Sequence, residues 1–338
     1  MKLPAHTPLV VTTRGNTIEC IHYGSIAVVD RSGRVVASAG DPGSVSFTRS
    51  SLKPFQALPF VEDGGLARFG FTSHELALMC ASHNAEPLHL GIARRMLARI
   101  GAGERDLKCG SHAPAIYAVL EQTPPRRPPH RPWSALCHNC SGKHAGFLSW
   151  CRLHRRPLGE YLDPQSPLQE RIRATLERLL PGALLARGID GCSAPNYAMP
   201  LERIALLYSR LASGGGALAD VRFAMTRHPD IVSGTARMDL ALMRTNASTD
   251  PWVAKGGAAG LQAIGIPGEG LGIAVRVVSG DPAAARIAAV EALRQLGLVK
   301  DPYRTPLAPF AGGPVRNDRG REVGDMRARF TLNRQPRH

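Results

Sequence analysis

The sequence predicts an α+β fold, with an antiparallel sheet of N- and C-terminal strands packed with a helical region. Short apolar segments bounded by turns lie near the start of the chain, helix-like segments fill its middle, and two more strand-like segments follow. Strands at both ends around a helical middle are typical of this class. The 338 residues, 43% hydrophobic and 20% charged, suffice for a large core and exclude wholesale disorder.

The first strands are predicted at residues 9–13, 25–30 and 34–38, where apolar and β-branched residues cluster. The turn-forming residues 30–33 (DRSG) join the last two strands as a hairpin, and 41–43 (DPG) form another turn. An apolar strand at 270–278 follows a glycine-rich loop, and 322–332 is predicted to close the sheet.

Helices are predicted where apolar residues recur at helical spacing or where start signals precede them. The predicted helices are residues 50–61, 73–82, 86–100, 143–155, 167–180, 200–212, 217–228 and 282–296. Pro54 falls in the first turn of its helix, where proline is tolerated, and Ser73 with Glu75 is a capping signal. Residues 123–132 are rich in proline and arginine and are predicted to form a loop.

We expect a single catalytic domain over residues 1–332 and a basic, disordered tail over 333–338. The 42 Lys and Arg exceed the 27 Asp and Glu by 15, but few aromatics are interleaved and no helix-turn-helix or zinc-finger pattern occurs. We therefore expect an arginine-rich solvated surface and no nucleic acid partner; a basic nucleic-acid-binding protein with a degenerate site is the alternative of another class. The sequence has neither a membrane span nor a good signal peptide, so we expect a cytoplasmic protein without membrane contact.

Three short motifs indicate a serine–lysine amide hydrolase. Ser50 precedes Lys53 by three residues at a helix start, so both side chains share one face, and a neutral lysine can take a serine's proton. Residues 82–84 (SHN) and 255–257 (KGG) complete the three-part signature of serine acyl-transferases, in the same chain order. For the first motif alone, a solvated helix start is the alternative.

The seven cysteines are scattered and odd in number, which does not predict a disulfide framework. Residues 137–144 (CHNCSGKH), with Cys192 far along the chain, form a candidate metal constellation because thiolates suit zinc. Spacing alone favours the C-x-x-C pair Cys137 and Cys140. Packed apolar cysteines beside surface histidines are an equally good interpretation of these residues.

Longer motifs over nearly the whole chain resemble the asparaginase II family, the rhizobial-type, zinc-containing L-asparaginases. The matching segments are 14–24, 49–56 (RSSLKPFQ), 81–84 (ASHN), 138–144 (HNCSGKH), 190–192 (DGC), 254–257 (AKGG) and 317–324. The resemblance implies a fold akin to serine β-lactamases and glutaminases. It also implies hydrolysis of the small molecule L-asparagine to L-aspartate and ammonia, and a homodimer.

The resemblance also assigns roles to individual residues. It implies two serine–lysine pairs, Ser50 with Lys53 and Ser82 with Lys255, and leaves open which serine is the nucleophile. It implies a Zn²⁺ ion whose ligands are Cys140, Lys143 and Cys192, and excludes Cys137. Residues expected to contact substrate or support the metal ligands are Arg49, His83, Asn84, Asn139, His144, Asp190, Gly256 and Gly257.

One departure from the family pattern concerns the segment after Lys255. The family commonly has a glutamate there, whereas residues 258–261 (AAGL) contain no acid, which puts efficiency or substrate choice in doubt. A glutaminase, or an amidase acting on peptides or β-lactams, keeps the same serine–lysine machinery with another substrate and is the alternative enzyme.

Overall fold

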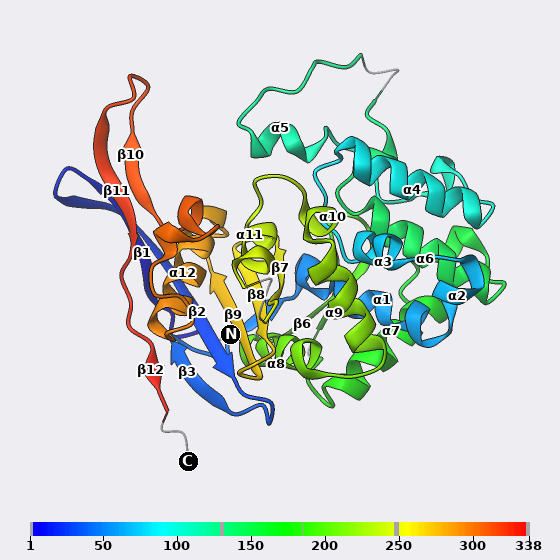
Figure 1. Cartoon of the computed structure of the whole chain (residues 1–338), viewed down its shortest axis with the longest axis horizontal. Coiled ribbons are helices and arrows are strands. Elements are labelled where there is room, and N and C mark those ends of the chain that lie inside the picture. The colour runs from blue at the N-terminus through cyan, green and yellow to red at the C-terminus, as the bar shows by residue number, and fades with distance from the viewer. Residues whose placement is uncertain (1–2, 129–131, 185, 247–249, 336–338) are drawn as a thin grey trace. The chain divides into compact units, whose positions relative to one another are not determined.

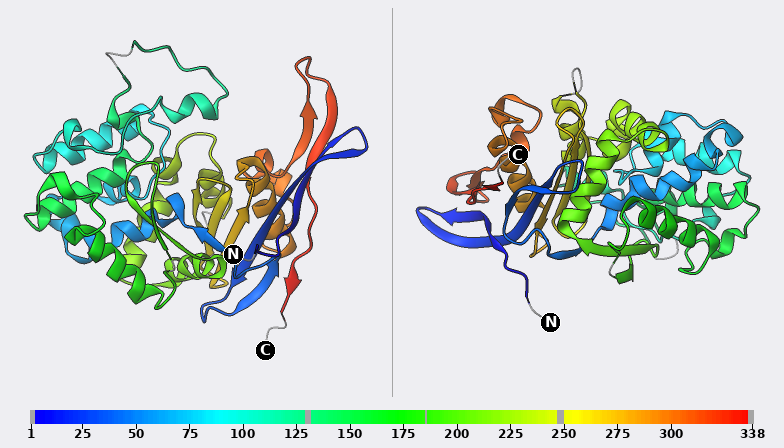
Figure 2. Two further views of the ribbon diagram at one scale, coloured as in Figure 1. Left: turned by 180° about the vertical axis from the view of Figure 1, so that it is seen from behind. Right: turned by 90° about the horizontal axis from the view of Figure 1, so that it is seen from below.

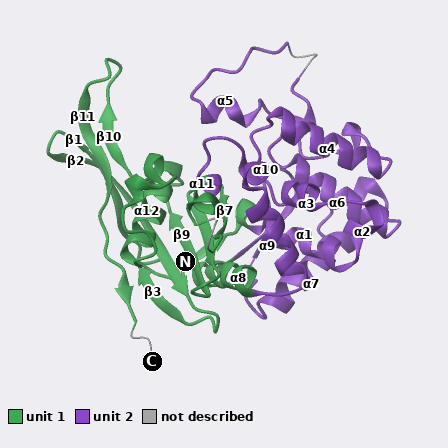
Figure 3. Cartoon of the chain, in the orientation of Figure 1, with its two compact units in different colours: residues 1–51, 199–213, 241–338 green, residues 52–198, 214–240 purple. Residues whose placement is uncertain are grey.

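The computed structural model describes residues 3–128, 132–184, 186–246 and 250–335. The chain divides into two compact units, shown in different colours in Figure 3. Unit 1 comprises residues 1–51, 199–213 and 241–338, and unit 2 comprises residues 52–198 and 214–240. The chain therefore passes from one unit to the other four times, after residues 51, 198, 213 and 240. The single catalytic domain over 1–332 stays a prediction.

Unit 1 is built on an antiparallel sheet of nine described strands in the order β10-β11-β1-β2-β9-β8-β7, with β3 beside β2 and β12 beside β3 (Figure 1). Its strands are β1 (Thr7–Arg14), β2 (Thr17–Val29), β3 (Val35–Ala39), β7 (Val253–Gly257), β8 (Leu261–Ile266), β9 (Leu271–Val277), β10 (Gly313–Arg316), β11 (Glu322–Ala328) and β12 (Asn333–Arg334). N-terminal and C-terminal strands are neighbours, which confirms the predicted α+β class.

Two helices, α8 (Leu201–Ser213) and α12 (Pro282–Gln295), pack on this sheet from opposite sides (Figure 2). A glycine in β9 allows α8 to approach closely. A Cβ atom at Gly272 would lie 1.8 Å from the carbonyl oxygen of Ala205. Any side chain there would push the helix off the sheet. Unit 1 also contains the short strand β4 (Val45–Phe47).

Unit 2 is mainly helical. Its α-helices are α1 (Lys53–Glu62), α2 (Gly65–Phe69), α3 (Ser73–Met79), α4 (Pro87–Arg99), α5 (Ala115–Val119), α6 (Ser141–Leu153), α7 (Pro167–Leu179), α9 (Ala217–Arg227) and α10 (Pro229–Ser233). A hairpin of β5 (Ala186–Ile189) and β6 (Pro195–Pro200) accompanies them, and α11 (Met238–Thr245) contains the last boundary between the units.

Helix α6 forms the centre of unit 2 and packs against α1, α3 and α4. Its residues from Ser141 to Cys151 are all buried, so it has no solvated face over that length. Two glycines bring it close to α3: a Cβ at Gly142 would lie 2.3 Å from the carbonyl oxygen of Leu78, and one at Gly146 would lie 2.8 Å from Cγ of Met79.

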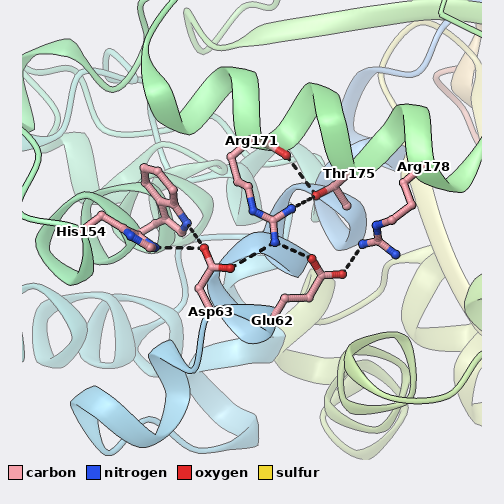
Figure 4. Close-up of polar contacts among 7 residues, drawn as sticks. Glu62, Asp63, His154, Arg171, Thr175 and Arg178 are labelled. Atoms are coloured by element: carbon pink, nitrogen blue, oxygen red, sulfur yellow. Dashed lines mark hydrogen bonds and ion pairs between the residues drawn. The ribbon is translucent and has the colours of Figure 1, made fainter.

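A polar network fixes the end of α1 against α6 and α7 (Figure 4). Arg171 of α7 bridges Glu62 and Asp63, with Nη2–oxygen distances of 2.8 and 3.1 Å. Asp63 also accepts hydrogen bonds from Trp150 at 2.8 Å and His154 at 2.9 Å. Although burial opposes its charge, the hydrogen bonds from Trp150 and Arg171 hold the pKa of Asp63 below its ordinary value.

The structure corrects several predicted boundaries. The helix predicted over 50–61 is a 3₁₀ turn, Arg49–Leu52, followed by α1, and the strand predicted over 25–30 is the end of the longer β2. Thr72 rather than Ser73 caps α3: its hydroxyl accepts from a backbone N–H of the first turn, and its own N–H donates to the Glu75 carboxylate. A threonine one position earlier places the glutamate at the third helical residue, as a capping box requires.

The first residues of the predicted disordered tail, 333–338, form a strand. Residues 333 and 334 form β12, which pairs with Ser38 and Ala37, while 336–338 lie outside the described residues. The predicted loop over 123–132 contains no helix or strand in its described residues, 123–128 and 132. None of the described helices is both long and apolar enough to cross a membrane.

Candidate active site

Lys53 and Ser82 of unit 2 form a buried hydrogen-bonded pair. Lys53 is the first residue of α1 and is 1% exposed, and Ser82, in the loop after α3, is 8% exposed. The Nζ atom of Lys53 lies 2.6 Å from the carbonyl oxygen of Ala81 and 2.8 Å from Oγ of Ser82. A neutral amine that donates to the carbonyl can accept the serine proton with its lone pair. Lys53 and Ser82 can therefore exchange a proton.

This contact differs from the pairing that the motifs imply. Ser82 is expected to pair with Lys255, and Lys53 with Ser50, whereas the structure brings Lys53 to Ser82. Lys255 and Ser50 belong to unit 1 and the other two residues to unit 2, so both implied pairings stay predictions.

His83 is a neutral, structural neighbour of Ser82. Its Nδ1 atom accepts from the backbone N–H of Ala85 at 3.1 Å, so Nε2 carries the proton and donates to Oγ of Ser141 at 2.9 Å. Burial, followed by the nearby His89 and Lys53, lowers the pKa of His83 well below its ordinary value. His83 therefore anchors the Ser82 loop to α6 and does not act as a cation.

Asn84 fixes the other side of the same loop. Its amide nitrogen donates to the carboxylate of Glu86 at 3.0 Å and to the carbonyl oxygen of Thr235 at 2.9 Å. Ala85, between them, has a positive φ of 59°, which an alanine adopts only under constraint. The loop after Ser82 is thus held in one conformation by side chains on both sides.

Strained backbone is concentrated at the predicted site. Seven described residues other than glycine have a positive φ, and three of them are Arg49 at 48°, Ala85 at 59° and Ser193 at 67°. Each of the three adjoins a residue that the motifs single out, namely Ser50, Asn84 and Cys192. Strain of this kind persists where the surroundings over-determine the backbone, as at functional sites.

Cys140, Lys143 and Cys192 come together in unit 2. Cys140 directly precedes α6, Lys143 lies in its first turn, and Cys192 lies in the turn of the β5–β6 hairpin. The three residues are at most 5% exposed, and Nζ of Lys143 lies 3.0 Å from Sγ of Cys192. A hydrogen bond with Cys192 lowers the pKa of Cys140 well below its ordinary value. Burial opposes the charge of Lys143, but the sulfurs of Cys192 and Cys140 outweigh it and raise the lysine's pKa.

This donor set fits zinc chemically. Two sulfur atoms and one nitrogen are soft or borderline ligands that Zn²⁺ accepts. Within the described part of the chain, no three His, Cys, Asp or Glu side chains are grouped to hold a metal, so the candidate set depends on Lys143. The fully buried Nε2 atom of His144 also has no hydrogen-bond partner, and Cys192 is close enough to act on the pKa of His144. An unpartnered buried nitrogen near the sulfur of Cys192 is consistent with a group bound there.

A tyrosine that carries no sequence motif orients His144. The hydroxyl of Tyr161 accepts from the backbone N–H of Lys108 at 2.7 Å and lies 2.8 Å from Nδ1 of His144. Because the tyrosine oxygen accepts from the backbone N–H of Lys108, its own hydroxyl proton is free to point to Nδ1 of His144. The imidazole proton of His144 is then on Nε2, on the side of Cys192. Burial lowers the pKa of His144 to about 4. Tyr161 is 17 residues from His144 in the sequence, and Cys192 is 49 residues from Lys143. No local sequence pattern could therefore reveal Tyr161.

The remaining residues of this region support the cysteines. Asp190 closes the hairpin turn, since its N–H donates to the carbonyl oxygen of Ala194 and its carboxylate accepts from the N–H of Gly191. The amide oxygen of Asn139 accepts from the Cys140 thiol at 3.2 Å. Spacing favours Cys137 as the partner of Cys140, but the structure pairs Cys140 with Cys192 instead. The expectation that Asp190 contacts substrate or supports the metal ligands stays a prediction.

The unit 1 residues of the predicted site lie on β7 and in the 3₁₀ turn that begins at Arg49. Lys255 is 1% exposed, and its Nζ atom lies 3.0 Å from the carbonyl oxygen of Gly256. A Cβ at Gly257 would lie 3.2 Å from the carbonyl oxygen of Thr48, so a glycine lets the segment before Ser50 lie close to the strand. Ser50 is partly exposed. The turn after β7 contains Ala259 at a φ of 61°.

A family model described as L-asparaginase II matches residues 10–328. The search of curated proteins gave no significant match. Among solved structures, a β-lactamase from Mycobacterium bovis is 14% identical over 82% of this chain and 95% of its own, with a TM-score of 0.39. Mglu in its native form is 17% identical with a TM-score of 0.43, and its L-glutamate binding form is 18% identical with a TM-score of 0.43. Both cover 82% of this chain, which spans 64% and 61% of their lengths, less than two thirds.

Proposed function

Because the chain belongs to the L-asparaginase II family, we propose that it hydrolyses the side-chain amide of L-asparagine to L-aspartate and ammonia. The family match confirms the resemblance read from the motifs and makes the chain an amidohydrolase acting on a small molecule. One observation carries the proposal: the buried amine of Lys53 lies 2.8 Å from the hydroxyl of Ser82, an arrangement able to move a proton.

In the proposed mechanism, Ser50 attacks the carboxamide carbon of the substrate and transfers its proton to Lys53. The lysine returns that proton to the departing nitrogen, so that ammonia leaves and an ester remains on Ser50. Water then attacks the ester and gives up a proton to the same lysine, which passes it to the departing Ser50 oxygen as L-aspartate leaves. Ser82, bonded to Lys53, relays protons together with Lys255, and the N–H groups of the glycines after Lys255 are candidates to hold the oxyanion.

We also propose that Cys140, Lys143 and Cys192 hold a zinc ion. Zinc, when bound, supplies positive charge that polarises a nearby oxygen. Lys143 must lose a proton to ligate, and its amine lies 3.0 Å from the sulfur of Cys192, which supports a shared site. Asp190, which fixes the turn carrying Cys192, keeps that sulfur in place.

Alanine substitution of the serines tests the mechanism. We expect Ser50→Ala and Lys53→Met to lower kcat for L-asparagine by about a hundredfold or more, because a nucleophile or its base is lost. If Ser82 only relays protons, the Ser82→Ala variant still forms the acyl-enzyme, and this step is observable as a burst of ammonia. Ser149→Ala is a matched control, since this buried hydroxyl bonds only within α6 at 2.7 Å to Ala145. Wild-type ammonia release by Ser50→Ala would exclude Ser50 as the nucleophile.

Assays with other substrates separate the asparaginase from its alternatives. L-Asparagine, L-glutamine and a chromogenic β-lactam are compared on the same sample, with zinc content measured alongside. Faster turnover of glutamine or of the β-lactam would replace the proposed substrate and keep the serine–lysine chemistry. Salt-sensitive nucleic acid binding without amidase activity would support the alternative of another class. The homodimer and the cytoplasmic location stay predictions.

A further inference from the structure

Arg276 of β9 lies on the same sheet face as the predicted catalytic strand of unit 1. The register aligns Gly257 of β7 with Leu261 of β8, and Leu261 with Arg276. Side chains directly opposite each other in antiparallel strands point to the same face. Lys255, two residues before Gly257, therefore shares that face with Arg276.

The segment that carries Ser50 lies against the same row. The carbonyl oxygen of Thr48 is 3.2 Å from the place where a Cβ of Gly257 would stand. Arg49 follows directly, in a strained backbone conformation with a φ of 48°. Ser50, Lys255 and Arg276 thus belong to one part of unit 1.

Arg276 has no counter-ion among the described residues. Its guanidinium is partly buried, and no described side chain or carbonyl forms a hydrogen bond or ion pair with it. Burial is the first cause that lowers its pKa, and the positive charge of Arg49 is the second; no acid offsets them. Partly buried charges are normally paired, and two neighbouring cations repel. An anion beside Arg276 would supply the counter-charge that the described residues do not give it.

We propose that Arg276, with Arg49 beside it, binds the α-carboxylate of the amino-acid substrate; this inference rests on the proposed function. A guanidinium presents two parallel N–H donors that match the two oxygens of a carboxylate. The substrate class is then free amino acids with a side-chain amide. Asparagine within a peptide, or with its carboxylate amidated, lacks the anion that Arg276 needs.

Arg276→Gln tests this assignment against Arg276→Lys and the control Arg286→Gln, an arginine of α12 that stacks on Phe310. We expect Arg276→Gln to raise KM for L-asparagine about 30-fold or more, with kcat changed far less, as is typical when one partner of a desolvated charge pair is removed. Arg276→Lys recovers part of the affinity, since it keeps the charge and loses the fork. Turnover of L-asparaginamide, which has no carboxylate, is the same in Arg276→Gln and wild type.

Binding of L-aspartate, followed by thermal shift, separates this inference from the proposed function. If wild type fails to hydrolyse L-asparagine but L-aspartate stabilises it, and Arg276→Gln abolishes that effect, the carboxylate site stands and the asparaginase proposal fails. If wild type is active and Arg276→Gln, with an unchanged melting temperature, keeps both the KM and the L-aspartate shift, Arg276 does not bind the carboxylate. Wild type that neither hydrolyses L-asparagine nor binds L-aspartate overturns both.

Discussion

At the scale of single residues, three buried lysines distinguish this chain. Lys53, Lys143 and Lys255 are at most 4% exposed, although lysine is almost never buried without a partner. Each has one: a serine hydroxyl, a cysteine sulfur or a backbone carbonyl oxygen. The formal charge of +15 counts all three as cations, yet each proposed role needs a neutral amine for part of the cycle.

The histidine–tyrosine pair beside Cys192 gives a prediction for metal affinity. His144→Gln is expected to weaken the proposed zinc binding about 10- to 100-fold, because a residue beside the candidate ligand Cys192 is lost. Tyr161→Phe weakens it less, since His144 keeps its place but loses the partner of Nδ1. Competition with a chromophoric chelator measures both constants. His89→Gln is the control, a buried histidine that bonds to the carbonyl oxygen of Asp230 instead; an equal loss in this variant would contradict the assignment.

Sequence reasoning singled out candidate site residues that lie in continuous motifs, and none that lie outside them. Cys140 and Lys143 lie in one segment, and the resemblance supplied Cys192, whereas spacing alone favours Cys137. Tyr161 and Arg276 lie in no recognisable sequence motif, and their proposed roles depend on residues far along the chain. Local patterns carry no information on such contacts.

At the scale of elements, the close approach of α6 to α3 predicts opposite effects of two glycine substitutions. Gly142→Ala places a methyl group 2.3 Å from a backbone oxygen of α3 and should lower the free energy of unfolding by about 1–3 kcal/mol or more. Gly91→Ala in α4 meets nothing closer than 3.6 Å and should raise it by about 0.5–1 kcal/mol, the helix propensity gain. Denaturant unfolding measures both. Equal signs for the two variants would show that the contact between α6 and α3 is looser than described.

The elements that sequence predicted best are the amphipathic helices. Predictions over 86–100, 167–180 and 282–296 each agree within one residue with α4, α7 and α12. Strands β7 and β8 were missed, because their glycines and alanines resemble a loop, although they are buried in the sheet. Helices of five residues, such as α2 and α5, are too short to show a period.

At the scale of the whole molecule, buried neutral histidines predict a loss of stability on mild acidification. His83 and His89 are fully buried, and burial lowers the pKa of each below its unfolded value of about 6.5. Below that pH the unfolded chain binds protons that the folded chain does not, so the free energy of unfolding falls as pH decreases. Each histidine contributes a slope of up to about 1.4 kcal/mol per pH unit.

Unfolding in urea at pH 7.5, 6.5 and 5.5 measures this slope. His89→Gln, compared with wild type, should be less stable at pH 7.5 and show a shallower decline below pH 6.5. Carboxylates with lowered pKa, such as Asp63, stabilise the protein above about pH 4 and lose that contribution only as pH falls further. A decline that begins only below pH 4 would therefore assign the effect to carboxylates and exclude the histidines.

The four passages of the chain between the units determine the order in which synthesis on the ribosome can complete the protein. Residues 52–198 emerge as one continuous stretch, so most of unit 2 can begin to fold early. Strand β1, made first, must wait for its neighbour β11, and the Thr13 hydroxyl meets Asp325 across 312 residues. Pairing over such separations is slow. Until then the first strands have an unprotected edge, which makes the nascent chain a candidate substrate for chaperones.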